Sequence, residues 1–360
     1  MPTKLVWAGH WKAARRSERR AMINAMEDKL EALKTIVEAA QHIVVIQADN
    51  PDGDSLGSAL ALEHILGDLG KQVTLYCGVD MPGYLHYLTG WDRVENRLPN
   101  KFDASIIVDA STLSLLEKLQ NSGELGWLAV KPCAVLDHHE KVENVVPFTQ
   151  VMINEPTRSS TGELIYRLAK QLDWPVSNAA GEGIMTAILG DTQGLSNQLA
   201  GGDTYRVMAE LTEQGVDRPA LEERRRELSK MPATIYTYKG TLLQRTEFHD
   251  EGRISLITIP QAEINAYSPL YNPAPLIQGD MLQTIGVQVA IVLKHYADGK
   301  VTGAIRCNPG YGVGAALAEH LGGGGHAFAS GFKVTNRNYD DVKADCISYC
   351  RELLANHASF

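Results

Sequence analysis

The segment IVVIQADNPDGDSLGS, residues 43–58, gives the strongest indication of the fold of this chain. Its first part, Ile43–Ala48, is a run of mostly apolar residues that is typical of a buried strand, and the residues after Asp54 have the apolar spacing of a helix. Gly53 permits a tight turn between Asp52 and Asp54. Two carboxylates are therefore predicted at the carboxyl end of a strand, which is where open α/β sheets bind ligands.

Three further segments place an acidic or histidine side chain directly after an apolar run. Two of the runs, Ser105–Val108 and Ala134–Leu136, are predicted strands, and the third, Ile184–Leu189, belongs to a predicted helix. The side chains that follow the three runs are Asp109, then Asp137, His138 and His139, then Asp191. We expect these groups to meet Asp52 and Asp54 at one edge of the sheet.

Carboxylates that crowd into one site need cations between them. The four concerned are Asp52, Asp54, Asp109 and Asp191. Two unit charges 4 Å apart repel by about 4 kcal/mol at an effective dielectric constant near 20, so crowding raises pKa values or requires two divalent ions. Oxygen ligands with one imidazole favour Mn²⁺ or Mg²⁺ over zinc. Two such ions about 3.5–4 Å apart can support displacement at phosphorus, so the pattern predicts phosphoester hydrolysis.

The length of the chain and the order of its elements predict two domains. At 360 residues and 39.4 kDa the chain exceeds one ordinary domain. Apolar runs alternate with helical stretches in residues 41–230, which predicts a mostly parallel sheet covered by helices. Residues 231–360 are predicted to form a smaller α+β domain, in which Thr237–Phe248 and Arg253–Ile259 are expected to be paired strands. We expect a cleft between the two domains.

Composition excludes several other classes of protein. No apolar run approaches the ~18 residues needed to cross a bilayer, and the N-terminus lacks the apolar region of a signal peptide, so a cytoplasmic location is expected. The chain has five cysteines without a C-x-x-C pair, which argues against a zinc knuckle or a disulfide framework and predicts reduced thiols in the core. A net charge of -9 excludes a wholly basic coat for nucleic acid.

Residues 1–40 are predicted to form a helical N-terminal extension. Basic residues of its first half fall on one helix face, and they are Lys12, Arg15, Arg16, Arg19 and Arg20. Such a stripe fits either a solvated helix or an arm that contacts RNA phosphates, and the sequence leaves both open.

Taken in order, these motifs resemble those of the DHH phosphoesterases, a family of two-domain, manganese-dependent enzymes that cleave small nucleotides and single-stranded nucleic acids. The four motifs of the catalytic domain are similar to Asn50–Ser58, Val108–Ser111, Asp137–His139 and Gly190–Thr192. The glycine-rich signature of the associated C-terminal domain resembles Gly322–Gly331.

The resemblance implies a role for each matching residue. The metal ligands that it implies are Asp52, Asp54, Asp109, His138 and Asp191. Asp109 would bridge two Mn²⁺ ions, with Mg²⁺ or Co²⁺ as alternatives, His139 would face the scissile phosphate, and Asp137 would orient its neighbours. The substrate-binding residues that it implies in the C-terminal domain are Arg306, Gly323, Gly324, Gly325 and His326.

One position departs from the family pattern. The family's first motif carries a metal-binding histidine three residues before the proline, where this chain has Ala48. A methyl group offers no lone pair, so one ion loses a ligand. Gln47 and Asp49 flank Ala48 but are expected on the opposite face of the strand. We expect Asp49 or a water to complete a weakened site.

The resemblance also indicates a short substrate. A chain with these two domains is similar to the branch that degrades oligoribonucleotides, dephosphorylates 3′-phosphoadenosine 5′-phosphate or cleaves cyclic or linear di-adenosine nucleotides. Members of the family often form homodimers, so a homodimer is one expectation.

Two other interpretations of the sequence compete with this one. A nucleotide-binding regulatory protein would keep the fold and lose turnover with the missing histidine. Asp52-Gly53-Asp54 also resembles the D-x-D of haloacid dehalogenase-type phosphatases, where the first aspartate is the nucleophile. That second interpretation leaves Asp137–His139 and the glycine signature unexplained.

Overall fold

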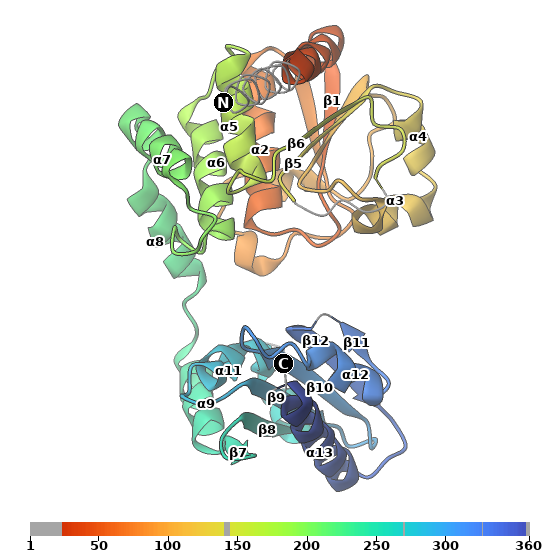
Figure 1. The fold of residues 1–360 in the computed structure, drawn as a ribbon, viewed down its shortest axis with the longest axis vertical. Coiled ribbons are helices and arrows are strands. Elements are labelled where there is room, and N and C mark those ends of the chain that lie inside the picture. The colour runs from red at the N-terminus through yellow and green to blue at the C-terminus, as the bar shows by residue number, and fades with distance from the viewer. Residues whose placement is uncertain (1–23, 140–144, 269–270, 326, 358–360) are drawn as a thin grey trace, which may run out of the picture. The chain divides into compact units, whose positions relative to one another are not determined.

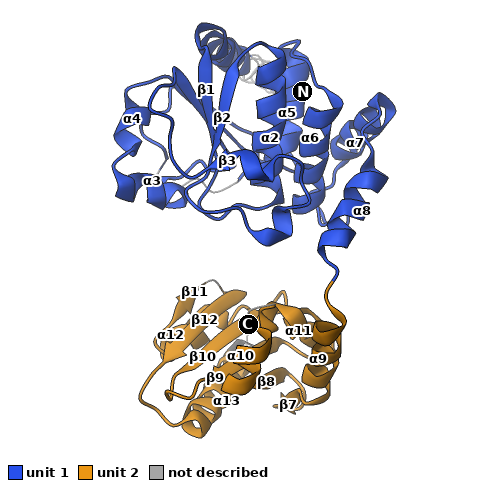
Figure 2. Cartoon of the chain, turned by 180° about the vertical axis from the view of Figure 1, so that it is seen from behind, with its two compact units in different colours: residues 1–230 blue, residues 231–360 orange. Residues whose placement is uncertain are grey.

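The structure is a computed structural model that describes residues 24–139, 145–268, 271–325 and 327–357. The basic stripe of the N-terminal extension lies outside these residues. The chain divides into two units, residues 1–230 and 231–360 (Figures 1 and 2). Each unit contains its own six-stranded sheet. The prediction of an α/β unit followed by a smaller α+β unit is confirmed.

The sheet of the first unit is parallel throughout and has the order β3-β2-β1-β4-β5-β6. Its strands are β1 His42–Ile46, β2 Gln72–Tyr76, β3 Val94–Glu95, β4 Ala104–Val108, β5 Cys133–Asp137 and β6 Val151–Asn154. Every residue of β4 and β5 is buried, which explains their continuous apolar runs. The strand order reverses between β1 and β4, and ligands of such sheets bind beyond the carboxyl ends at that point.

Helices cover both faces of this sheet (Figure 1). One face packs against a helix over residues 24–39 and against α2 Gly53–Asp68, α5 Thr161–Gln171 and α6 Asn178–Asp191. The other face packs against η3 Leu113–Leu116, α3 Glu117–Ser122 and α4 Leu125–Ala129. Two further helices, α7 Gly202–Gln214 and α8 Arg218–Leu228, follow α6. Within the described ranges, no helix combines the length and apolar character that a membrane crossing requires.

Facing glycines bring α2 and α6 together. A Cβ atom on Gly57 would lie 2.5 Å from the carbonyl oxygen of Gly183, and a Cβ atom on Gly183 would lie 2.5 Å from that of Gly57. Where α2 begins and α6 ends, a Cβ atom on Gly190 would lie 3.6 Å from the Cα atom of Gly53. This close packing sets the start of α2 beside the end of α6, and both of these helix ends carry candidate site residues.

Gly57→Ala should lower the free energy of unfolding by about 1–3 kcal/mol, because the new methyl group overpacks the contact between α2 and α6. Gly67 lies in the same helix, and a Cβ atom there would meet nothing within 4 Å. Gly67→Ala should therefore raise stability by up to about 1 kcal/mol through helix propensity alone. Urea denaturation of both variants measures the difference. Equal effects at the two positions would contradict this account of the helix contact.

The second unit has a mixed sheet with the order β11-β12-β10-β9-β8-β7, in which β8 and β9 are parallel and the other neighbours antiparallel. Its strands are β7 Glu247–His249, β8 Ile254–Pro260, β9 Val289–His295, β10 Val301–Cys307, β11 Gly324–Gly325 and β12 Ala329–Val334. One face packs against α12 Gly314–His320 and α13 Tyr339–His357. The opposite face packs against α9 Ala233–Gln244 and α11 Pro273–Leu282, and α10 Gln261–Tyr267 follows β8.

The prediction of a strand over Thr237–Phe248 is wrong for most of its length. Residues Ala233–Gln244 form helix α9, and the strand β7 contains only Glu247–His249. The β-branched and aromatic residues of the segment favour a strand. Three buried residues of α9 nevertheless have the helical spacing i, i+3, i+7, and they are Ile235, Tyr238 and Leu242. Their packing against the sheet overrides the local preference.

Candidate active site

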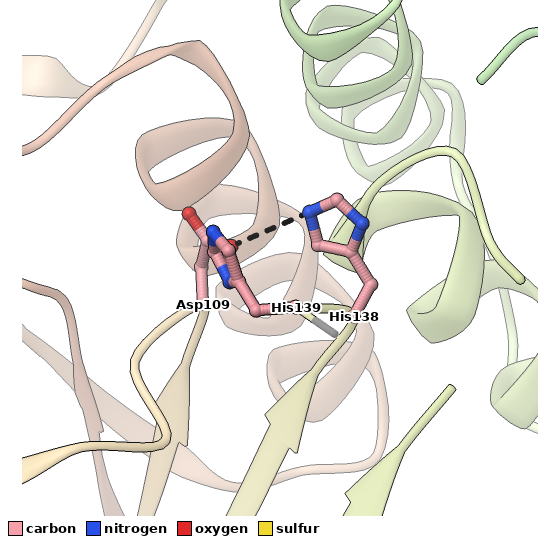
Figure 3. Close-up of side chains that lie close together, drawn as sticks. All are labelled: Asp109, His138 and His139. Atoms are coloured by element: carbon pink, nitrogen blue, oxygen red, sulfur yellow. Dashed lines mark ion pairs between the residues drawn. The ribbon is translucent and has the colours of Figure 1, made fainter. Parts of the chain in front are cut away.

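The carboxyl edge of the first sheet brings most of the predicted site residues together. Asp54 lies in the first turn of α2, Asp109 follows β4, His138 and His139 follow β5, and Asp191 ends α6. Potential ligand atoms of Asp54, His138 and Asp191 lie within 4.8 Å of one another, and so do those of Asp109, His138 and His139. Figure 3 shows the second group, with a dashed line for the ion pair between His138 and Asp109.

The Nε2 atom of His138 is the point that the two groups share. It lies 2.9 Å from Oδ2 of Asp191, 3.4 Å from Oδ2 of Asp54 and 3.8 Å from Oδ1 of Asp109. This buried atom makes no hydrogen bond within the described residues, although carboxylates surround it. The other ring nitrogen, Nδ1, lies 3.3 Å from the carbonyl oxygen of Arg158, which can only accept, so Nδ1 carries a proton. The ring is thus oriented with Nε2 towards the carboxylates.

Asp54 is a buried carboxylate held by the N-terminus of α5. Its Oδ2 accepts a hydrogen bond from the backbone N–H of Thr161 at 2.7 Å, and its Oδ1 accepts one from the N–H of Gly162 at 3.0 Å. The Ser58 hydroxyl donates to the same Oδ1 at 2.9 Å. A helix N-terminus favours negative charge. Burial and the nearby Asp191 carboxylate nevertheless raise the pKa of Asp54 to about 6.

Asp109 adopts a left-handed backbone conformation with φ of 57° directly after β4. Among residues other than glycine, aspartate and asparagine are the ones that most often tolerate this region. The buried side chain accepts a hydrogen bond from the Thr161 hydroxyl at 3.1 Å. Burial, followed by the charge of Asp54, raises the pKa of Asp109 well above its usual range. Unusual backbone conformations of this kind are concentrated at functional sites.

Asp137 positions the two histidines. Its Oδ1 accepts hydrogen bonds from the backbone N–H groups of His138 at 2.7 Å and His139 at 3.2 Å, and it lies 2.7 Å from Nδ1 of His139. Its Oδ2 accepts a hydrogen bond from the N–H of Ser111 at 2.9 Å. Burial raises the pKa of Asp137, but hydrogen bonds from His139 and Ser111 lower it to about 2 overall. The buried Asp137 is therefore charged, while the His139 ring is half exposed.

The centre of the site favours positive charge. Burial lowers the pKa of His138, but the carboxylates of Asp191 and Asp54 raise it to about 9 overall. The charge of Asp191 also helps to raise the pKa of Asp54, and the charge of Asp54 helps to raise the pKa of Asp109. An unbonded imidazole nitrogen among three carboxylate oxygens is a donor set that fits a hard divalent cation.

Residues 42–189 match the family described as "DHH family, N-terminal domain", and residues 274–352 match the DHHA1 domain. The chain therefore contains a DHH domain followed by a DHHA1 domain.

Relatives of this DHH protein carry names of nucleotide-cleaving enzymes. It is 24% identical over 330 residues to the "Bifunctional oligoribonuclease and PAP phosphatase NrnA" of Thermus thermophilus, and the match covers 91% of this chain and 95% of that protein. It is 23% identical to the "Cyclic-di-AMP phosphodiesterase PdeA" of Listeria monocytogenes, over 82% of this chain and 45% of that protein.

A solved structure of an exopolyphosphatase-related protein from Bacteroides fragilis is similar in fold. Its TM-score is 0.74 at 20% sequence identity, and the match covers 91% of this chain and 98% of that chain. At this identity the likeness shows the fold that the two chains share.

Within the DHH domain, Asp52 is the predicted ligand that belongs to neither group of converging side chains in the described residues. Its Oδ1 accepts hydrogen bonds from the backbone N–H groups of Asp54 and Ser55 at 3.0 Å each, so Asp52 caps α2. Both hydrogen bonds use one oxygen. The Asp52 charge nevertheless helps to raise the pKa of Asp109, after burial and the charge of Asp54, so the carboxylate lies within electrostatic reach of the site.

In the DHH domain, Ala48 is buried and belongs to an apolar cluster that also contains Ala110 and Leu116. Asp49 is bound elsewhere, because its Oδ2 accepts a hydrogen bond from the backbone N–H of Lys118 at 2.7 Å. The Gln47 side chain is fully buried, and neither of its amide atoms has a hydrogen-bond partner in the described part of the chain. The other oxygen of Asp49, Oδ1, is buried and has no hydrogen-bond partner among the described residues either, so completion of the site by Asp49 or a water stays a prediction.

Thr161 and Gly162 contact the DHH site, although no sequence motif marks them as site residues. Local sequence does mark the start of α5, where Ser160 acts as the cap by accepting a hydrogen bond from the N–H of Glu163 at 3.0 Å. Gly162 is required where α5 approaches α6, since a Cβ atom there would overlap the Cβ atom of Ala187. The cap is predictable from local sequence, whereas the contact with Asp54 joins residues more than 100 positions apart.

In the DHHA1 domain, Arg306 and the glycine motif lie on strands that share a neighbour. Strand β12 pairs with β10 and β11, with Arg306 opposite Ala329 and Gly325 opposite Ser330. Both Arg306 and Gly325 are exposed. His326 lies outside the described residues.

Packing accounts for part of the glycine motif. A Cβ atom on Gly323 would overlap the carbonyl oxygen of Gly331, and Gly325 has φ of 135°. A Cβ atom on Gly324 would meet nothing within 4 Å. Two of the three predicted binding glycines are thus required by the backbone, whatever they bind.

Proposed function

We propose that this protein is a phosphoesterase that hydrolyses short oligoribonucleotides or small nucleotides, such as di-adenosine nucleotides or 3′-phosphoadenosine 5′-phosphate. The observation that carries the proposal is the convergence of Asp54, Asp109 and Asp191 on the unbonded Nε2 atom of His138. The names of the Thermus and Listeria relatives agree with substrates of this class.

The residues that would hold two Mn²⁺ ions are Asp52, Asp54, Asp109, His138 and Asp191. Asp109 belongs to one group of possible ligands and lies 3.8 Å from the histidine nitrogen that joins both, so it is suited to bridge the ions. When bound, such ions lower the pKa of a water molecule and neutralise charge on phosphoryl oxygens. Mg²⁺ and Co²⁺ are the alternatives, because the donor set is mostly oxygen.

The other side chains position these groups and the substrate. Thr161 fixes Asp109 through its hydroxyl and Asp54 through its N–H. The hydrogen bond with Asp137 raises the pKa of His139, so the half-exposed imidazole can donate to an oxygen of the scissile phosphate. In the second unit, Arg306 would bind another phosphate of the substrate, together with His326 and the N–H groups of Gly323, Gly324 and Gly325.

A second candidate function is supported by Ala48. With alanine in place of the family's histidine, one ion would depend on water or on Asp49 for its remaining ligand, and the unpartnered amide of Gln47 is a further candidate. A protein that binds nucleotides without cleaving them would follow if that ion were lost. Five ligand positions and His139 are retained, which favours the enzyme.

Incubation with Mn²⁺ and the linear dinucleotide pApA separates the two functions. The enzyme should release AMP, with product separated by ion-exchange chromatography, and EDTA should stop the reaction. Tight binding of pApA without AMP release, measured by calorimetry, would support the regulatory protein and contradict the proposed activity.

A further inference from the structure

Tyr84 presents an exposed aromatic ring beside the candidate metal site. It lies in the short helix η1 Gly83–Leu85, and 60% of its surface is exposed. Its hydroxyl donates a hydrogen bond of 2.8 Å to the carbonyl oxygen of Pro51, the residue before Asp52. The ring is therefore tied to the first motif and faces solvent at the same time.

The segment that carries Tyr84 also borders the other end of the site. Tyr87, three residues later, lines a pocket of about 400 Å³ together with Gly190. Gly190 precedes Asp191 and lies against Gly53, since a Cβ atom on Gly190 would lie 3.6 Å from the Cα atom of Gly53. Tyr84 and Tyr87 thus lie next to two of the three segments that supply carboxylates, the one with Asp54 and the one with Asp191.

The segment is held rigidly. Leu85 is buried in the core, and the Nε2 atom of His86 lies 2.9 Å from the carbonyl oxygen of Met81. The His86 ring stacks on Trp91, with 3.4 Å between ring centroids. A ring fixed in this way loses little conformational entropy when a ligand covers it.

We propose that Tyr84 is a stacking platform for a nucleobase of the substrate, an assignment that rests on the proposed function. A nucleobase stacks favourably on an exposed aromatic ring, whichever of the bases it is. Such stacking contributes about 1–3 kcal/mol per base to the free energy of binding. The phosphodiester bonded to that nucleoside then lies within reach of the neighbouring carboxylates. Tyr84 in this way makes the site selective for nucleotides over phosphoesters that lack a base.

Tyr84→Leu and Tyr84→Phe, assayed with Mn²⁺ on pApA, test the proposal. Stacking predicts that Tyr84→Leu lowers kcat/KM by about tenfold or more, while Tyr84→Phe stays within about threefold of wild type, because phenylalanine keeps the ring. Two dinucleotides that each carry one abasic residue complete the test. For the analogue that lacks the stacked base, Tyr84→Leu and wild type should have equal kcat/KM.

Tyr205→Leu is a matched control. The Tyr205 ring is 51% exposed, and its hydroxyl donates a hydrogen bond to the carbonyl oxygen of Leu195 at 3.0 Å. Like Tyr84, it is therefore an exposed ring whose hydroxyl is bound to a backbone carbonyl oxygen. This variant should leave kcat/KM unchanged. Equal losses for Tyr84→Leu and Tyr84→Phe would assign a structural role to the hydroxyl and overturn the proposal, as would equal losses on all three dinucleotides.

A binding measurement separates failure of this proposal from failure of the proposed function. The fluorescence of 2-aminopurine is quenched when the base stacks, and it can be followed with a 2-aminopurine dinucleotide whether or not the protein cleaves pApA. Stacking is supported if the fluorescence is quenched on binding to wild type and to Tyr84→Phe but not on binding to Tyr84→Leu. Quenching that survives in Tyr84→Leu overturns it, whereas an absence of hydrolysis by wild type overturns only the activity.

Discussion

Asp109→Asn should lower the turnover of pApA by at least about 10³-fold. The substitution removes the negative charge that Asp109 is proposed to share between two ions. A bound metal stabilises the transition state by several kcal/mol. Each loss of about 1.4 kcal/mol lowers the rate tenfold. Asparagine is the suitable replacement, because it tolerates the left-handed φ of 57° that this position requires. Steady-state rates with saturating Mn²⁺ measure the loss.

The same substitution should leave the metal-free protein at least as stable as wild type. Burial and the charge of Asp54 raise the pKa of Asp109, so removing the carboxyl group relieves an unfavourable interaction. Asp173→Asn is the control, since Asp173 also has a positive φ, of 53°, and is more accessible to solvent. Asp173→Asn should change neither rate nor stability. Full activity of Asp109→Asn would exclude a bridging role for Asp109.

Asp137→Asn should reduce activity by about 10–100-fold and stability by about 1–3 kcal/mol. Both oxygens of Asp137 accept hydrogen bonds from backbone N–H groups, those of His138 and His139 on one side and that of Ser111 on the other. Whichever way the amide of asparagine is oriented, its NH₂ group faces a donor. His138 and His139 would then lose their fixed orientation, and we expect weaker Mn²⁺ binding together with the lower rate.

Urea denaturation and a Mn²⁺ titration of Asp137→Asn measure the two effects. Asp103→Asn is the matched control, because Oδ2 of Asp103 also accepts two backbone hydrogen bonds, from Gln41 and His42 at 2.9 Å each, near the starts of β1 and β4. That variant should lose stability but retain the Mn²⁺ affinity and the rate of wild type. Matching losses of rate in both variants would show that Asp137 acts through stability alone.

Much of the first unit is predictable from the sequence, because its signals are local. The apolar run of β1 ends just before the turn that leads to Asp54, the run of β4 ends at Asp109, and the run of β5 ends at Asp137. In a parallel sheet the carboxyl ends of the strands lie at one edge, so these residues are expected to be neighbours. The five cysteines are free and buried, as predicted. Asp52 shows the limit of this reasoning, since it caps a helix in addition to any role with a metal.

The rest of the site depends on contacts between distant parts of the chain. The hydrogen bonds that join Thr161 to Asp54 and Asp109 leave no pattern in either segment. The strand β6, Val151–Asn154, has a weak sequence signal, because it is short and lies at the edge of the sheet. Helix α9 has the composition of a strand, and packing overrides that local preference. The homodimer, the cytoplasmic location and the interdomain cleft stay predictions.

The number of Mn²⁺ ions that one chain binds is the most direct test of the account. Equilibrium dialysis with elemental analysis gives the number, and electron paramagnetic resonance shows whether the ions interact. The account predicts two ions per chain with a magnetically coupled signal, and loss of the coupling in Asp109→Asn. Wild-type protein that binds no Mn²⁺, or two ions without any coupling, would contradict it.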